Sequence, residues 1–190
     1  MQTAITGCGW VTPQAAGDIN TVLQAYASCG AEACLSSRYE PIGSEIFSQF
    51  TNLSGEAAKE EAVRLAAVAL EIAWKQAGLS GASYASHRKG LVLGCALAGV
   101  SGMIDFANDV RKQTPRFVSP IRFPQTVGNY ICGALARGYD FRGPASTIAC
   151  GSASSLEGIR EGCALLTSGQ ADVVIAGGTE LLSPEIVEGL

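Results

Sequence analysis

Residues 143–156 read GPASTIACGSASSL, in which an apolar run with β-branched residues meets a cysteine and then a series of small residues. The run at 145–149 suits a short buried strand, and Gly143-Pro144 suits the turn before it. Beyond the cysteine, apolar residues recur every three to four positions, as on a helix, at Leu156, Ile159, Cys163 and Leu166. The pattern predicts that Cys150 lies at a strand-to-helix corner, where unpaired N–H groups favour a thiolate.

The rest of the chain alternates apolar strands with helices. Continuous apolar runs predict core strands at 91–95 and 172–178. Helices are expected at 56–77, 101–112 and 125–137. Strands that are apolar throughout and alternate with helices are typical of a parallel sheet covered on both faces. We therefore expect an α/β fold with a mostly parallel sheet and helices on both faces, as one domain spanning residues 1–190.

The remaining segments carry weaker signals. Residues 4–11 read as a first strand that runs into a glycine-rich turn. Asp18 is a suitable N-cap for a short helix. Residues 29–54 have no clear period, so we expect a loop with a short strand near 44–50, and the prolines of 114–124 indicate another loop.

Charge and hydropathy exclude several classes of function. A net charge of −4 without a basic cluster gives no electrostatic case for nucleic-acid binding. No segment has the length and polarity of a membrane span, and the N-terminus lacks the features of a signal peptide, so we expect a cytoplasmic protein. Only 16% of residues are charged and 47% are hydrophobic, which leaves apolar surface for a partner to cover.

Cysteines and glycines give no evidence of a metal or a cofactor. The seven cysteines include no CxxC pair, and apart from Cys150 we expect them to be reduced, buried small residues. The single histidine, His87, lies in a polar turn without a ligand cluster, so a metal site is not expected. Gly7 and Gly9 lack the third glycine of a dinucleotide fingerprint, and residues 94–99 lack the lysine of a phosphate loop. We expect no cofactor.

Cys150 itself has two interpretations. It is either a small core residue or a nucleophile, because a sharp strand-to-helix turn presents its side chain outward next to backbone donors. The segment 147–154 (TIACGSAS) resembles the nucleophile motif of β-ketoacyl synthases, the condensing enzymes of fatty acid and polyketide synthesis in the thiolase superfamily. Further segments resemble that family in the same order: 5–13 (ITGCGWVTP), 119–124 (SPIRFP), 127–129 (VGN), 140–144 (DFRGP) and 171–180 (ADVVIAGGTE).

The resemblance implies a thiolase-like layered fold and an acyltransferase function in fatty acid or polyketide synthesis. Cys150 would accept an acyl group as a thioester from an acyl carrier protein, with its own backbone N–H as one oxyanion donor. Phe123 and Ile131 would line the acyl pocket, for which ordinary core packing is the alternative. Basic and aromatic residues within 106–123 would contact the carrier protein, for which a solvated polar face is the alternative.

The resemblance covers the N-terminal half of the family. The catalytic histidines are expected in a C-terminal half, and His87 does not match either of them. One hypothesis is therefore a half-synthase that pairs with itself or with a full-length ketosynthase, which supplies the missing groups. A second is a non-catalytic partner subunit, similar to chain-length factors, although the cysteine counts against it. A third is a fragment without function or a module used only for assembly.

Overall fold

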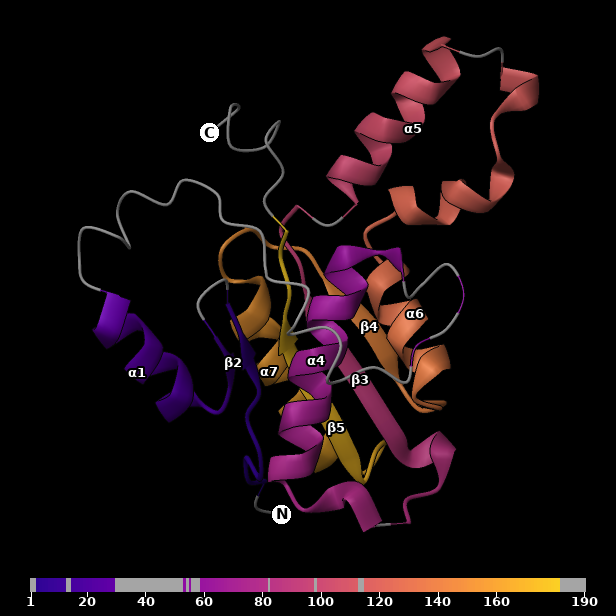
Figure 1. Ribbon diagram of the computed structural model, residues 1–190. Helices are drawn as coiled ribbons and strands as arrows, with labels where there is room; N and C mark the ends of the chain where they lie inside the picture. The colour runs from indigo at the N-terminus through magenta and orange to yellow at the C-terminus, as the bar shows by residue number, and fades with distance from the viewer. Residues whose placement is uncertain are drawn as a thin grey trace.

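The computed structural model describes residues 3–12, 15–29, 53, 55, 59–81, 83–97, 99–112 and 115–181. Three parallel strands form the central sheet in the order β4-β3-β5 (Figure 1). The central strand β3 spans Lys89–Gly94, and its neighbours are β4 at Ala145–Ile148 and β5 at Val173–Gly178. In register, Leu93 of β3 lies opposite Thr147 on one side and Gly177 on the other. The predicted parallel α/β sheet is confirmed.

Helices cover the two faces of this sheet. Helices α4 (Glu61–Gln76) and α6 (Tyr130–Gly138) pack on the face that carries Leu91 and Leu93, in the main hydrophobic core. Leu91, Leu135 and Val63 are fully buried there, and each side chain contributes about 2 kcal/mol through burial. Helix α7 (Ser154–Thr167) packs on the opposite face. Gly158 and Gly162 lie against β3 and β5, so the small residues of α7 face the sheet.

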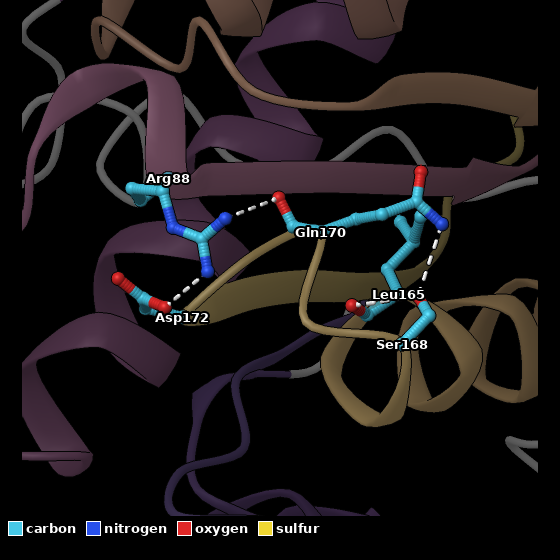
Figure 2. A network of polar contacts seen from close by, with 5 residues as sticks. All are labelled: Arg88, Leu165, Ser168, Gln170 and Asp172. Carbon is cyan, nitrogen blue, oxygen red and sulfur yellow. Dashed lines mark hydrogen bonds and ion pairs between the residues drawn. The ribbon is translucent and has the colours of Figure 1, made fainter.

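Hydrogen bonds fasten the amino-terminal edge of the sheet (Figure 2). The Arg88 guanidinium lies 2.6 Å from Asp172 Oδ1 and donates to the Gln170 carbonyl at 3.3 Å. The Gln170 amide donates to Ser168 Oγ at 2.9 Å, and the Ser168 hydroxyl donates to the Leu165 carbonyl at 3.3 Å. The bond from Arg88 lowers the pKa of the Asp172 carboxyl. These contacts join the residue before β3, the start of β5 and the end of α7.

The N-terminal segment differs from the prediction. A strand at 4–11 was expected, but of these residues only Trp10–Val11 form a strand (β1). This strand pairs antiparallel with Ala16–Gly17 (β2). The preceding residues lie against α4 so closely that a Cβ on Gly7 would be 2.2 Å from the Ala73 carbonyl oxygen. Gly9 approaches Ala69 in the same way, at 2.0 Å. Because Gly7 and Gly9 have no side chains, the backbone of this segment can pack directly against α4.

Helix boundaries follow the local capping chemistry. The predicted Asp18 cap is confirmed, because Asp18 Oδ1 accepts from the Thr21 N–H at 2.8 Å at the start of α1 (Ile19–Cys29). Helix α4 begins at Glu61, later than the expected start at 56, and Gly78 follows its end with φ +70°. The strand expected near 44–50 lies outside the described residues.

Residues 100–127 form an arm that projects from the sheet and its helices (Figure 1). Helix α5 (Val100–Lys112) matches the helix predicted at 101–112. The expected loop contains two short 3-10 helices, at Pro115–Phe117 and Pro120–Thr126, and α5 packs mainly against the second of them. Helix α6 was expected from residue 125 but begins at Tyr130, because the Pro120–Thr126 turn ends at an extended Val127.

Two further 3-10 helices, at Leu79–Gly81 and Ser86–Arg88, complete the described elements. Within the described ranges, no helix is both long and apolar enough to cross a membrane.

Candidate functional site at the carboxyl edge of the sheet

Cys150 lies on an exposed turn between β4 and α7, at the carboxyl edge of the parallel strands. Strand β4 ends at Ile148, whose carbonyl accepts from the Cys95 N–H at 2.9 Å, and α7 begins at Ser154. Gly151 has φ +69°, a conformation that suits glycine and turns the chain toward the helix. Cys150 is a free and exposed thiol. The predicted strand-to-helix corner is therefore present, and the core-residue interpretation of Cys150 does not fit its exposure.

The buried hydroxyl of Ser154 stabilises this turn through two hydrogen bonds. Its side chain is only 3% exposed, and its hydroxyl accepts from the Cys150 N–H at 3.0 Å while it donates to the Gly151 carbonyl at 2.5 Å. The Cys150 N–H was expected to be free for an oxyanion. Ser154 engages it instead, so in this arrangement the N–H is not available to a substrate oxygen.

Two glycines allow the first turn of α7 to sit on the sheet edge. A Cβ on Gly94, the last residue of β3, would lie 2.3 Å from the backbone of Ser154. A Cβ on Gly178, the last residue of β5, would lie 1.8 Å from Ser155 Oγ. The sequence pattern placed Gly94 in a core strand and in a segment that lacks the lysine of a phosphate loop, but it gave this glycine no packing role. The signal for that role is a glycine in the last positions of both predicted core strands, 91–95 and 172–178.

Phe123 and Ile131 lie in different environments. Ile131 is 5% exposed and belongs to the main core, whereas Phe123 on the arm is 57% exposed and meets Phe106 edge-on at 5.9 Å. Among the described residues, neither Phe123 nor Cys150 lines the pocket that Ile131 borders. An acyl pocket formed by Phe123 and Ile131 stays a prediction.

The pocket beside Ile131 lies where the arm joins the body and contains two carboxylates. Glu180 Oε2 accepts from the N–H groups of Ala96 and Leu97 at 2.7 and 3.0 Å. Burial raises the pKa of Glu60, and the negative charges of Asp105 and Glu61 raise it further, against a smaller effect of Arg122. The pocket is lined by Glu60, Ala62, Leu97, Gly99, Ser101, Gly102, Gln125, Val127, Tyr130, Ile131, Glu180 and Leu181.

The other cysteines are only partly as expected. Cys95 and Cys132 are buried, and burial raises the pKa of Cys95 to about 11, so this thiol stays protonated at neutral pH. Burial also raises the pKa of Cys132. The expectation of a buried residue was wrong for Cys163, which is exposed on α7 because the small residues of the helix face the sheet. Cys8 is half-buried.

His87 lies far from the cysteine turn in the sheet topology. It is exposed in the turn Ser86–Arg88 before β3, at the amino edge, whereas Cys150 follows β4 at the carboxyl edge. The interpretation of His87 as a surface residue is confirmed. Over the part of the chain that the structure describes, no group of three or more histidine, cysteine or acidic residues is placed to hold a metal ion.

Comparisons of the sequence with known proteins identify related proteins. A model of the β-ketoacyl synthase N-terminal domain matches residues 46–190. The 3-oxoacyl-[acyl-carrier-protein] synthase 2 of Rhizobium meliloti is 30% identical over 91 residues, which are 48% of this chain and 22% of that protein.

Solved structures share the fold over nearly the whole chain. A type II polyketide ketosynthase, in a structure with its acyl-carrier protein, matches 97% of this chain and 47% of its own, with a TM-score of 0.71 and 18% identity. The ishigamide ketosynthase/chain length factor matches 94% of this chain and 52% of its own, with a TM-score of 0.70 and 23% identity. The chain thus spans about half the length of these ketosynthases. With residues 46–190 matching the family's N-terminal domain, the chain belongs to the β-ketoacyl synthase family.

Proposed function

We propose that this chain takes part in acyl transfer in fatty acid or polyketide synthesis, with Cys150 as the residue that accepts the acyl group. The observation that carries the proposal is the exposed Cys150 thiol on the turn from β4 into α7, with small residues on either side. A free, exposed thiol on this turn is accessible to an acyl donor.

In the proposed step, Cys150 Sγ attacks the carbonyl carbon of an acyl thioester on a carrier protein. A carbon–sulfur bond forms at Cys150, the bond to the carrier sulfur breaks, and the proton released by Cys150 passes to the departing carrier thiolate. In the tetrahedral intermediate of this step, the former carbonyl oxygen carries a negative charge. The Cys150 N–H can stabilise that charge only if its hydrogen bond to the Ser154 hydroxyl is broken.

A complete condensation also needs groups that drive decarboxylation of a malonyl unit. The one histidine of the 190 residues lies at the opposite edge of the sheet from Cys150. We infer that groups outside these residues supply this step, through self-association or pairing with a full-length ketosynthase.

Acylation of Cys150 is tested by intact-mass spectrometry after incubation with an octanoyl-loaded acyl carrier protein. One octanoyl adduct per chain is expected, and it is lost in Cys150→Ala. Cys163→Ser is the matched control, because it removes the other thiol that is exposed among the described cysteines and should leave labelling unchanged.

Ser152, which is also exposed on this turn, provides a second control. Neutral hydroxylamine cleaves a thioester much faster than an ester, so a rapidly cleaved adduct identifies a cysteine. An adduct that survives hydroxylamine and disappears in Ser152→Ala would contradict the assignment to Cys150. The absence of any adduct, with or without a co-purified ketosynthase, would also reject it.

The second candidate function is a non-catalytic partner subunit, similar to a chain-length factor. Two structures that share this fold are described as ketosynthase and chain length factor pairs, so both roles occur among proteins of this shape. If Cys150→Ala leaves the activity of a co-purified ketosynthase intact, the partner role is favoured. A loss of that activity rejects it.

A further inference from the structure

The buried Ser154 hydroxyl occupies a backbone N–H that the proposed acyl transfer needs. Its Oγ accepts from the Cys150 N–H at 3.0 Å and donates to the Gly151 carbonyl at 2.5 Å. The side chain is buried, so solvent has little access to these bonds. During acylation, the negative oxygen of the tetrahedral intermediate needs the same N–H as a donor. Ser154 and the substrate oxygen therefore compete for one hydrogen bond.

The helix start around this hydroxyl is held in place by contacts with the sheet. The backbone of Ser154 lies so close to Gly94 that a Cβ on the glycine would be 2.3 Å from it. Further along α7, a Cβ on Gly158 would lie 3.2 Å from the Gly177 carbonyl oxygen. Because backbone meets backbone at both points, a movement of α7 would also disturb the edge of the sheet. Rotation of the Ser154 side chain about χ1 moves only Oγ.

This rotation leaves the turn itself closed. The Gly151 carbonyl also accepts from the Ser154 N–H at 3.1 Å, so it keeps a donor when the hydroxyl moves away. Helix α7 keeps its next bond, from the Glu157 N–H to the Ala153 carbonyl at 3.0 Å. The cost of opening is therefore confined to the hydroxyl, which gives up both of its partners in a buried position.

We propose that Ser154 is a positioning residue that holds the Cys150 N–H in a resting state and slows acylation until its hydroxyl rotates away. This inference rests on the proposed acylation of Cys150 and adds a form of regulation to that site. In the resting state the hydroxyl stabilises the turn, and in the acylating state the N–H contacts the negative oxygen instead. Stability and acylation rate therefore depend on the same hydroxyl with opposite signs.

The test compares acylation of the parent chain and of Ser154→Ala by an octanoyl-loaded acyl carrier protein. Without the hydroxyl the N–H is open, so acylation at saturating carrier protein is expected to be about fivefold faster, which corresponds to ~1 kcal/mol. The carrier concentration at half-saturation should not change, because Ser154 is buried. The matched control is Ser155→Ala, which removes the exposed hydroxyl one position along and should acylate at the parent rate.

Alkylation of the same chains with iodoacetamide separates this role from a purely structural one. Alkylation displaces iodide from a saturated carbon and forms no oxyanion, so Ser154→Ala should leave its rate at Cys150 unchanged. The reaction is followed on the tryptic peptide 143–160, in which Cys150 is the only cysteine.

An equal change in both rates would mean that the variant only loosens the turn, and it would overturn the proposal. If the parent chain is acylated and Ser154→Ala is no faster, the role of Ser154 is rejected while the proposed function stands. If no chain is acylated, both are rejected.

Hydrogen exchange gives a measurement that needs no variant and so does not depend on whether Ser154→Ala folds. In a chain with isotopically labelled cysteines, the Cys150 amide is followed by nuclear magnetic resonance. It should exchange with deuterium at least about tenfold more slowly than an unstructured cysteine amide, because Ser154 accepts from it. Exchange at the unstructured rate would show that the N–H is open in the resting state and would overturn the proposal.

Discussion

The two edges of the parallel sheet are built in contrasting ways. At the amino edge, Arg88 pairs with Asp172, and Asp140 accepts from Ser86 and Arg142, so exposed carboxylates are matched by donors. At the carboxyl edge, Gly94 removes side-chain bulk, and Cys150 lies on an exposed turn. Ligands of α/β sheets bind outside the carboxyl ends of the strands. The contrast shows that exposed ion pairs hold the amino edge together, whereas glycines at the carboxyl edge let the start of α7 pack closely beside the exposed cysteine turn.

The largest expected effect comes from adding a side chain at this close contact. Gly94→Ala places a Cβ 2.3 Å from the backbone of Ser154, which cannot move without shifting α7. We expect a loss of about 3 kcal/mol in the free energy of unfolding, measured by urea denaturation. The control is Gly177→Ala, where a Cβ meets nothing within 4 Å and the expected loss is below about 1 kcal/mol. Equal losses would show that the close contact is not the cause.

Ser154→Ala tests the support of the cysteine turn. The variant leaves the Cys150 N–H and the Gly151 carbonyl without their shared partner. A loss of about 1 to 2 kcal/mol in unfolding free energy is expected. Ser155→Ala, at the neighbouring exposed position, should stay within about 0.5 kcal/mol of the parent chain. A neutral Ser154→Ala would mean that the turn does not depend on this hydroxyl.

At the carboxyl edge, Glu60 should make stability fall as pH rises. Its pKa in the fold is raised above the ordinary 4.5, mainly by burial, so the folded state binds the proton more tightly than the unfolded chain. The favourable contribution is present at low pH and is lost as pH rises through the folded pKa. Glu60→Gln is therefore expected to raise the thermal unfolding midpoint at pH 7 and to have little effect at pH 4. A midpoint that falls at pH 7 would contradict this sign.

At the amino edge, Asp172 should give the opposite and smaller dependence. Its pKa is lowered from 3.8 by the hydrogen bond from Arg88, so its contribution is present above that value and is lost as pH falls through the folded pKa. Asp172→Asn is expected to flatten the acid side of a plot of unfolding midpoint against pH below about 4. The pair is exposed, so 0.5 M salt should reduce the difference between the two chains.

Patterns of residues along the chain predicted the elements of the core but not their close contacts. The runs around Leu91 and Val174 were correctly assigned to parallel strands, because continuous apolar runs that alternate with helices are typical of a parallel sheet. The N-terminal strand was predicted to be longer than it is. Gly7 and Gly9 pack against α4, which lies about 60 positions later in the sequence, and local periodicity carries no information about such contacts. Helix α6 started late because a proline-rich 3-10 turn preceded it.

The candidate site was found only in part for the same reason. The position of Cys150 follows from a strand pattern changing into a helix pattern. The contact of Ser154 with its N–H, and the two carboxylates of the pocket, depend on residues brought together from separate segments. Cys163 was misassigned because helical spacing identifies an apolar stripe but not which side of the helix faces the sheet.

The contact of the N-terminal segment with α4 has a consequence for the order in which the chain folds during synthesis. The Cys8 N–H donates to Gln76 Oε1, 68 positions later in the sequence. The segment that contains Cys8 therefore lacks this partner until α4, 68 positions later, has been synthesised. During that interval it stays without this contact, and mutations that delay formation of α4 lengthen the time in which this apolar segment is open to aggregation.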